Sequence, residues 1–332
     1  MKIVSHLNPK LFDSDIERVP NRDGFGIALK EAGENNKQIV ALSADLTEST
    51  RTNLFAEAFP ERFIQCGVAE QNMASVASGL AAVGKIPFIT SYAMFSPGRN
   101  WEQVRTTIAY NNQNVKIIGA HSGVSVGPDG ATHQAIEDIA IMRVIPNMVV
   151  IAPADIHEAK KAVLWAADYK GPVYIRLGRS PVPTVTGIGT PFESGKAQLL
   201  IERTKHSKQS VCLVTTGSTL HNGILAAKEL DKIDISVSLL HTPTIKPLDV
   251  ASLQEMAETH NLIVTIEEHQ IVGGLGSAVT EYISEKHPMK VIRIGVNDQF
   301  GQSGEPEELI SHYKIDAKSI VERIKNEIDY LN

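Results

Sequence analysis

The chain has 332 residues and a formal net charge of −6, with 42% hydrophobic and 21% charged residues. That length suggests two domains of about 150 residues each, the negative charge gives no basic surface for nucleic acid, and no apolar run approaches the roughly 20 residues of a membrane span. Two cysteines occur without metal-ligand spacing, and the first residues lack the layout of a signal peptide, so we expect a cytoplasmic protein without disulfides.

Short β-branched runs recur in the first half of the chain, each followed by a turn and a helix-like stretch. They lie at 38–44, 85–91, 115–120, 147–153 and 172–178. After a segment rich in Pro, Gly and Thr, similar runs return at 210–217, 235–241, 261–268 and 290–296. Continuous apolar strands that alternate with amphipathic helices indicate parallel sheets covered on both faces. We therefore predict an α/β fold with two domains, 1–182 and 196–332, joined by a linker at 183–195.

Residues 63–85, FIQCGVAEQNMASVASGLAAVGK, predict a short strand, a glycine turn and a helix that ends at Gly84. The helix is predicted from apolar residues at 3.6-residue spacing: Met73, Val76, Ala77, Leu80 and Ala81. Glu70 then lies in or just before the first turn. The residues alone leave two interpretations open, a functional carboxylate or one that the helix dipole favours.

Two polar loops follow strands in the first domain. SADLTEST (43–50) carries Asp45 and Ser49, either of which could instead cap a helix. GAHSGVSVGPDGATHQAIED (119–138) carries His121, Asp129 and His133 in a glycine-rich loop, before a helix expected to begin around Thr132 or His133. Loops at strand ends commonly carry ligand-binding residues. A metal site is disfavoured because no further ligand has the close spacing of a zinc motif.

Two further motifs have ordinary structural alternatives. SYAMFSPGR (91–99) places Tyr92 and Phe95 three residues apart, a pair that more often belongs to a core than to a cofactor platform. EEHQIVGGLGSAV (267–279) is glycine-rich but lacks the full G-x-G-x-x-G, since Val279 stands at the last position. For the second motif we therefore favour close helix–strand packing over dinucleotide binding.

Taken together and in order, these motifs resemble one family. SADLTEST, CGVAEQNM, SYAMFS, GPDGATHQAIED, IPNMVVIAPAD and YIRLGRS are similar to the pyrimidine-binding domain of transketolases, and IEEHQIVGGLGSAV to the transketolase C-terminal domain. The likeness extends from about Arg22 to the last helix but covers only the second half of a full-length transketolase. It points to the C-terminal subunit of a split, two-polypeptide enzyme.

The resemblance implies roles for individual residues. Glu70 stands where thiamine-diphosphate enzymes have a glutamate that contacts N1′ of the cofactor's aminopyrimidine and promotes its imino tautomer. Tyr92 and Phe95 correspond to aromatics that enclose the pyrimidine, whereas Gly98 replaces a third aromatic found in many transketolases. Substrate contacts are implied for Arg22, Asp45, Ser49, His121, Asp129, His133 and Arg179, with Arg176 as a competitor of Arg179 for the phosphate. His121 and His133 would also serve proton transfer and oxyanion stabilisation, as catalytic residues.

The family's diphosphate site is missing from the sequence. That site uses a G-D-G stretch followed by an asparagine ligand to Mg²⁺, and no GDG occurs here. The resemblance thus implies that this chain holds the pyrimidine end of thiamine diphosphate, has no metal site of its own, and depends on an N-terminal subunit that binds Mg²⁺ and the diphosphate. We expect a heterotetramer of two copies of each subunit, with an apolar surface around Glu70 that is buried between subunits.

Three other assignments remain open. A half of 1-deoxyxylulose-5-phosphate synthase is similar in its C-terminal region, but SADL and the set His121, Asp129 and His133 favour transketolase. The β subunit of a 2-oxo-acid dehydrogenase differs in the histidine-bearing loop, which is 119–138 in this chain. A non-catalytic scaffold subunit is disfavoured because Glu70, Tyr92, His121 and His133 are retained. The resemblance leaves the donor and acceptor sugars undetermined.

Overall fold

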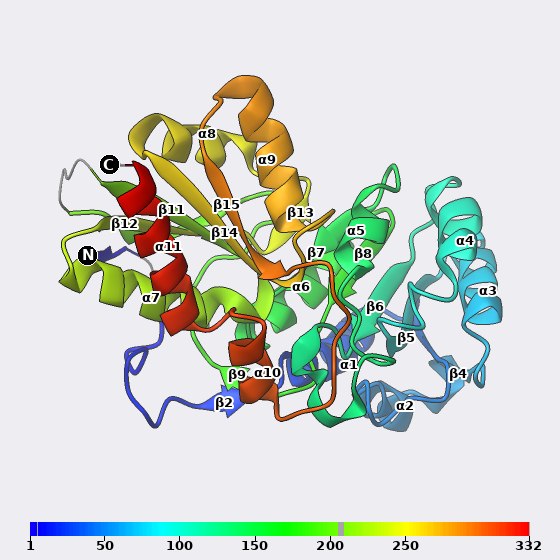
Figure 1. The fold of residues 1–332 in the computed structure, drawn as a ribbon. Helices are drawn as coiled ribbons and strands as arrows, with labels where there is room; N and C mark the ends of the chain where they lie inside the picture. The colour runs from blue at the N-terminus through cyan, green and yellow to red at the C-terminus, as the bar shows by residue number, and fades with distance from the viewer. Residues whose placement is uncertain (5, 205–208, 332) are drawn as a thin grey trace.

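A computed structural model of the protein describes residues 1–4, 6–204 and 209–331. Its first domain is a seven-stranded sheet in the order β13-β7-β8-β6-β5-β3-β4 (Figure 1). Six of the strands are parallel, and β13 (Thr244–Lys246) pairs antiparallel with β7 at the edge. The parallel strands are β3 (Ile39–Ser43), β4 (Phe63–Gln65), β5 (Ile86–Tyr92), β6 (Lys116–Ala120), β7 (Val149–Ile151) and β8 (Val173–Arg176).

The helical segments of this domain connect and cover these strands. They are α1 (Asn21–Asn35), α2 (Asn53–Ala58), the 3₁₀ turn η1 (Pro60–Arg62), α3 (Glu70–Ala82), α4 (Trp101–Gln103), the π-helical η2 (Val104–Ala109), the 3₁₀ segment η3 (Val124–Asp129), α5 (Asp138–Arg143) and α6 (Ile156–Asp168). The helix expected from Thr132 begins at Asp138 instead. Residues before it turn back toward the sheet, where Gly123 N donates to Ala135 O and Ser122 forms a bridge with Ala135.

The second domain is a six-stranded sheet in the order β1-β10-β12-β11-β14-β15. The strands are β1 (Lys2–Ile3), β10 (Gln198–Glu202), β11 (Ser210–Thr215), β12 (Ser236–His241), β14 (Leu262–Gln270) and β15 (Val291–Val296), of which the last four are mutually parallel. Its helical segments are η4 (Gly217–Thr219), α7 (Leu220–Lys232), α8 (Val250–Thr259), α9 (Leu275–Lys286), α10 (Pro306–His312) and α11 (Ala317–Leu331). The predicted α/β fold with mainly parallel sheets is confirmed.

The two sheets exchange strands along the chain. β1 comes from the N-terminus but joins the second sheet, and β13 comes from the second half but joins the first. The segment expected to be a linker contains β9 (Val182–Pro183), which pairs with β2 (Arg18–Val19). The buried Asp155 carboxylate, which caps α6, accepts five hydrogen bonds, three of them from Val185 and Thr186. This segment is therefore packed against the first domain, and the domain boundary at 183–195 stays a prediction.

The hydrophobic core consists of three layers of buried side chains. One lies between the first sheet and the pair α1 and α6, and another between the second sheet and the pair α7 and α11. The middle cluster contains residues of both sheets, including Leu42, Ile117, Val214 and Leu240. Burying apolar surface shared by both domains fixes how they sit against each other. Among the residues that the structure describes, none of the helices combines the length and apolarity that a membrane crossing requires.

Candidate active site

Glu70 is the first residue of α3 and its side chain is 1% exposed. Its carboxylate Oε2 accepts a hydrogen bond from Arg99 Nη1 at 2.8 Å, and Asn100 Nδ2 donates to the Glu70 carbonyl at 3.2 Å. The side chain of Ala69, which precedes the helix, forms no cap. The helix dipole stabilises a carboxylate at the N-terminus of a helix, but the Glu70 carboxylate is also buried and bonded to a specific cation, Arg99. Arg99 follows Phe95 by four residues, but no motif in the sequence marks it as a partner of Glu70.

The helix behind Glu70 is only partly packed. Met73, Ala74 and Ala77 are fully buried, whereas Val76, expected on the inner face, is 36% exposed. Val68 before the helix is 71% exposed and Val83 after it is 76% exposed. The apolar residues of this segment therefore extend beyond the buried face of α3 onto a face that the rest of the chain leaves exposed.

Four rings form a cluster next to this helix. Tyr92, at the end of β5, stacks on His121 with a centroid separation of 3.8 Å and on Phe95 at 6.1 Å. His133 contacts Tyr92 and Phe95 edge-on, at 6.0 and 5.6 Å. Arg99 lies over the Phe95 ring at 4.9 Å, which connects the cluster to Glu70. Residues separated by more than sixty positions in the sequence thus come together at the carboxyl ends of the parallel strands.

His121 is held as a neutral ring with one unpartnered nitrogen. Arg22 Nη1 lies 3.0 Å from His121 Nε2, and because a guanidinium can only donate, Nε2 accepts and Nδ1 carries the proton. Burial, followed by the charges of Arg22 and Arg179, lowers the pKa of His121 to about 3. Its buried Nδ1 finds no hydrogen-bond partner among the described residues. An orphaned donor in a polar site points to a ligand atom that would accept from it.

Three arginines surround this histidine. Arg22 Nη1 also donates to the Ser49 carbonyl at 2.8 Å, and its buried Nε is a second donor without a partner among the described residues. Burial lowers the pKa of Arg22, and the guanidiniums of Arg51 and Arg179 act in the same direction. Arg51 is balanced by Asp23, whose Oδ1 accepts from Arg51 Nε at 2.6 Å. The remaining excess positive charge and the free donors suit an anionic group such as a phosphate.

Arg176 and Arg179 have different environments. Arg176 is 6% exposed, and its Nε donates to both carboxylate oxygens of Asp138, at 3.1 and 2.9 Å, while its Nη2 donates to the Glu268 carbonyl. Arg179 is half-buried, and its Nη1 donates to the Val126 carbonyl at 2.9 Å. Arg176 is thus committed to a buried ion pair, whereas Arg179 remains the candidate for the phosphate.

The remaining candidates lie at the edge of the cluster. Asp45 and Asp129 are exposed, and neither carboxylate bonds to the four rings in the described residues. Asp45 and His121 both have a positive φ, of 61° and 54°, a conformation that non-glycine residues adopt mainly in specialised turns. Ser49 contributes its carbonyl to Arg22. At Gly98, a Cβ would lie 2.0 Å from the Met94 carbonyl oxygen, so the close backbone approach excludes the third aromatic here.

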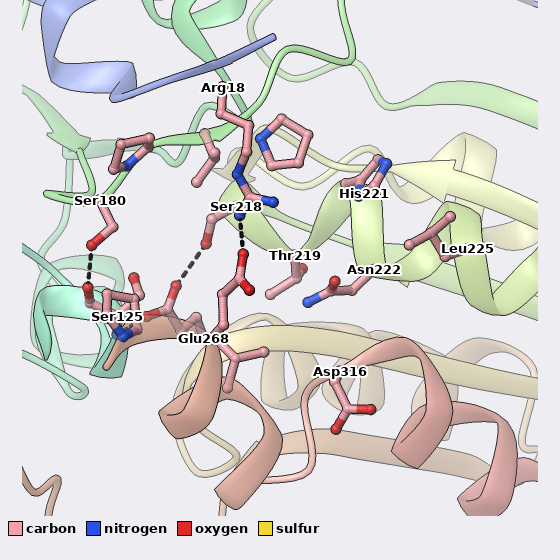
Figure 2. A pocket seen from close by; sticks show the side chains of 16 residues that line it. Arg18, Ser125, Ser180, Ser218, Thr219, His221, Asn222, Leu225, Glu268 and Asp316 are labelled. Atoms are coloured by element: carbon pink, nitrogen blue, oxygen red, sulfur yellow. Dashed lines mark hydrogen bonds and ion pairs between the residues drawn. The ribbon is translucent and has the colours of Figure 1, made fainter. Parts of the chain in front are cut away.

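The second domain holds in place the histidine loop, residues 121–133, which carries His121, Asp129 and His133. Glu268, at the carboxyl end of β14, accepts from Ser125 N at 2.6 Å and from Ser218 Oγ at 2.7 Å (Figure 2). These groups line an interdomain cavity of about 360 Å³, where Ser180 Oγ also donates to the Ser125 carbonyl. From the other side, Gln134 Nε2 donates to the carbonyls of Val124 and Gln302. One structural role of this domain is therefore to fix η3, between His121 and His133.

The backbone N–H groups that follow the glycine-rich turn before α9 donate to the carboxylate of Glu267. The Glu267 oxygens accept from Leu275 N and Gly276 N, both at 2.7 Å. Burial raises the pKa of Glu267 to about 7. A Cβ at Gly276 would lie 2.7 Å from Thr265 Oγ1 and 2.8 Å from Arg293 Cγ, so α9 packs tightly on β14 and β15. The prediction of close helix–strand packing is confirmed.

Comparisons with known proteins give the family of the chain. Residues 17–184 match the family model of the transketolase pyrimidine-binding domain, and residues 201–320 that of the transketolase C-terminal domain. The chain belongs to the transketolase family. It is 43% identical to a transketolase C-terminal section of Methanocaldococcus jannaschii over 92% of this chain and 96% of that protein. It is 37% identical to a 6-deoxy-6-sulfo-D-fructose transketolase subunit of Clostridium sp., over 93% of this chain and 95% of the subunit.

A solved structure extends the comparison to the fold. A split-gene transketolase, described as an inactive β4 tetramer, superposes with a TM-score of 0.85 at 44% identity and covers 93% of this chain and 98% of that one. Within the family, the chain therefore corresponds to the C-terminal subunit of a split transketolase. Its pyrimidine-binding domain implies dependence on thiamine diphosphate, and its split relatives imply an N-terminal partner subunit and an oligomer. In the part of the chain that the structure describes, no three His, Cys, Asp or Glu side chains gather to hold a metal ion.

Proposed function

We propose that this chain is the pyrimidine-binding half of a transketolase that transfers a two-carbon ketol group from a ketose phosphate to an aldose. One observation carries the proposal: a buried carboxylate, an aromatic stack and an excess of buried donors meet at the ends of β5 and β6. Glu70 and the unpartnered Nδ1 of His121 mark the two sides of this place. Both features fit a cofactor ring on one side and an oxygen-rich substrate on the other.

Glu70, Tyr92 and Phe95 would hold the pyrimidine end of thiamine diphosphate. The Glu70 carboxylate would bond to a ring nitrogen, exchanging its present partner Arg99 for the cofactor or sharing itself between the two. Tyr92 and Phe95 offer flat, stacked surfaces for an aromatic ring. When bound, the cofactor supplies the centre that stabilises the carbanion of ketol transfer.

The residues beyond the rings would bind the sugar. Because His121 stays neutral and carries its proton on Nδ1, it can donate to a carbonyl or hydroxyl oxygen without changing its charge. His133, whose Nδ1 bonds to Thr132 Oγ1 at 2.9 Å, would move protons at the same oxygens. Arg22, oriented by the Ser49 carbonyl, and Arg179 would bind the phosphate. Asp45 and Asp129 would contact sugar hydroxyls.

An N-terminal subunit would complete the site with Mg²⁺ and the diphosphate-binding residues, in a cytoplasmic heterotetramer of two copies of each chain. Three exposed valines at the ends and on the outer face of α3, Val68, Val76 and Val83, support a subunit contact beside Glu70. The inactive state of the β4 tetramer of a relative is consistent with a C-terminal subunit that needs its partner.

The experiment that tests this function uses the chain reconstituted with the N-terminal subunit, thiamine diphosphate and Mg²⁺. Mass spectrometry should detect a product ketose two carbons longer than the aldose supplied. A panel of phosphorylated, sulfonated and unsubstituted ketoses separates a general transketolase from one specialised like the Clostridium relative, since an arginine pair can accept either anion. Absence of carbon transfer from every donor, in a complex that binds the cofactor, would contradict the proposal and favour a scaffold role.

A further inference from the structure

A cavity of about 400 Å³ opens at the carboxyl ends of β14 and β15, in the second domain and outside the site described above. Figure 1 shows β15 in orange running toward the loop that leads to α10, with α11 in red beside it. The cavity lies among these elements, with Ile271 after β14, Asn297 after β15, and Ser319 in the first turn of α11 on its wall. The crevice at the carboxyl ends of parallel strands is where open α/β sheets bind ligands.

The lining of this cavity carries one sign of charge. Arg293, Lys314 and Arg323 face it together with His312, and among the described side chains no aspartate or glutamate lines it. The chain as a whole has a net charge of −6, so a cavity with three cations and no acid departs from the average surface. A cavity lined by one sign of charge attracts ions of the other sign.

The fold explains only part of this clustering. His312 and Lys314 lie at the end of α10, where cations are favoured by the helix dipole. Arg293 comes from β15 and Arg323 from α11, so no single helix end accounts for all four side chains. The nearby carboxylate of Glu327 serves two cations, Arg323 at 2.9 Å and Lys290 at 2.5 Å, and leaves the group with excess positive charge.

Lys314 also stands in a backbone conformation that favours glycine. Its φ is 59°, and its amide donates to the Ser311 carbonyl just after α10 ends. Helices commonly end with a left-handed residue at this point, and glycine or asparagine adopts that conformation at lower cost than lysine. Lys314 thus places a strained backbone conformation on the wall of the cavity, and such conformations are common at binding sites.

We propose that this cavity, defined by Arg293, His312, Lys314 and Arg323, binds a small organic anion with two phosphate groups, at a site separate from the catalytic one. Arg293, Lys314 and Arg323, the last shared with Glu327, would offset the charge of the two phosphates, and Ile271 and Ile294 offer an apolar wall to the organic part. The site lies on the β14–β15 edge whose neighbouring residue Glu268 holds the histidine loop, so an occupied cavity is placed to influence catalysis.

Inorganic pyrophosphate is the probe, titrated calorimetrically into the full chain without Mg²⁺, alone and with the N-terminal subunit. Arg323→Gln should weaken binding about tenfold or more, the loss of one bond to a charged group. Lys325→Gln is the matched control, because Lys325 is exposed on the same helix but does not line the cavity. Lys314→Gly should weaken binding while raising Tm by about 1–3 °C, since it relieves backbone strain. A variant that misfolded could not do both.

Arg179→Ala distinguishes this cavity from the proposed phosphate site of the active centre. We expect pyrophosphate binding to the second domain to survive that change. The proposal is overturned if pyrophosphate does not bind at millimolar concentration, if Lys325→Gln weakens binding as much as Arg323→Gln, or if Arg179→Ala alone abolishes it.

Discussion

Replacing Arg179 by alanine tests whether the cationic corner of the site binds the substrate's phosphate. Arg179 is half-buried, donates one hydrogen bond to Val126 O at 2.9 Å, and already acts electrostatically on Arg22 and His121. Removing it should cost the fold little, because that single bond holds a loop that Ser180, Gln134 and Glu268 also hold. Removing a bond to a phosphate should cost about 1.5–3 kcal/mol, equivalent to about a 10- to 150-fold loss in kcat/KM.

The assay is steady-state ketol transfer by the reconstituted complex, with one ketose phosphate and the same ketose without its phosphate. We expect the loss to appear with the phosphorylated donor, chiefly in KM, and to be small with the other. Arg179→Lys should recover part of the activity, because it keeps the charge but loses the planar pair of donors. Equal losses with both donors would show that Arg179 does not bind the phosphate.

Three further predictions follow from the same contacts. Glu70→Gln should leave the fold intact and lower kcat by about 10² or more; near-normal turnover at saturating cofactor would mean that Glu70 only serves the helix dipole. Arg176→Ala should lower the free energy of unfolding by about 3–5 kcal/mol in urea, because it leaves Asp138 buried without its cation, and a loss below about 1 kcal/mol would contradict the buried pair. The pKa of His121 is lowered from 6.5 to about 3 on folding, so its contribution to stability is present above pH 6.5 and is lost as pH falls toward 3. Wild type should therefore lose about 2 kcal/mol relative to His121→Asn between pH 7 and 5, and a constant difference in unfolding free energy would show that His121 titrates normally.

Much of the fold could be predicted because its signals are local. Every apolar run expected as a strand forms one, and α3 begins at Glu70, since alternating strands and helices leave a periodic trace in the sequence. The sequence pattern does not predict β1, β2, β9, β10 and β13, because pairing with distant segments rather than their own pattern defines these strands. The helix expected at Thr132 was wrong for a similar reason: Ala135 bonds back to Gly123 and Ser122.

The residues of the candidate site also fall into two groups, those that sequence motifs can nominate and those that only tertiary contacts reveal. Motif order was sufficient to nominate Glu70, Tyr92, Phe95 and the two histidines, and the structure brings them together, while their roles stay proposals. Arg99 could not be nominated, because one arginine in a loop carries no signal until its partner is known. The choice between Arg176 and Arg179 likewise needed the position of Asp138, thirty-eight residues from Arg176.

The affinity of the isolated chain for thiamine diphosphate shows whether this chain depends on an N-terminal subunit. If this chain grips only the pyrimidine end, the charged diphosphate stays without a metal or fixed donors to offset its desolvation, and binding should be weak. Titration calorimetry with Mg²⁺ should show an affinity at least about 100-fold lower for the lone chain than for the complex with the N-terminal subunit, and no ketol transfer without that subunit. Tight, Mg²⁺-dependent binding with full turnover from this polypeptide alone would contradict its dependence on an N-terminal subunit.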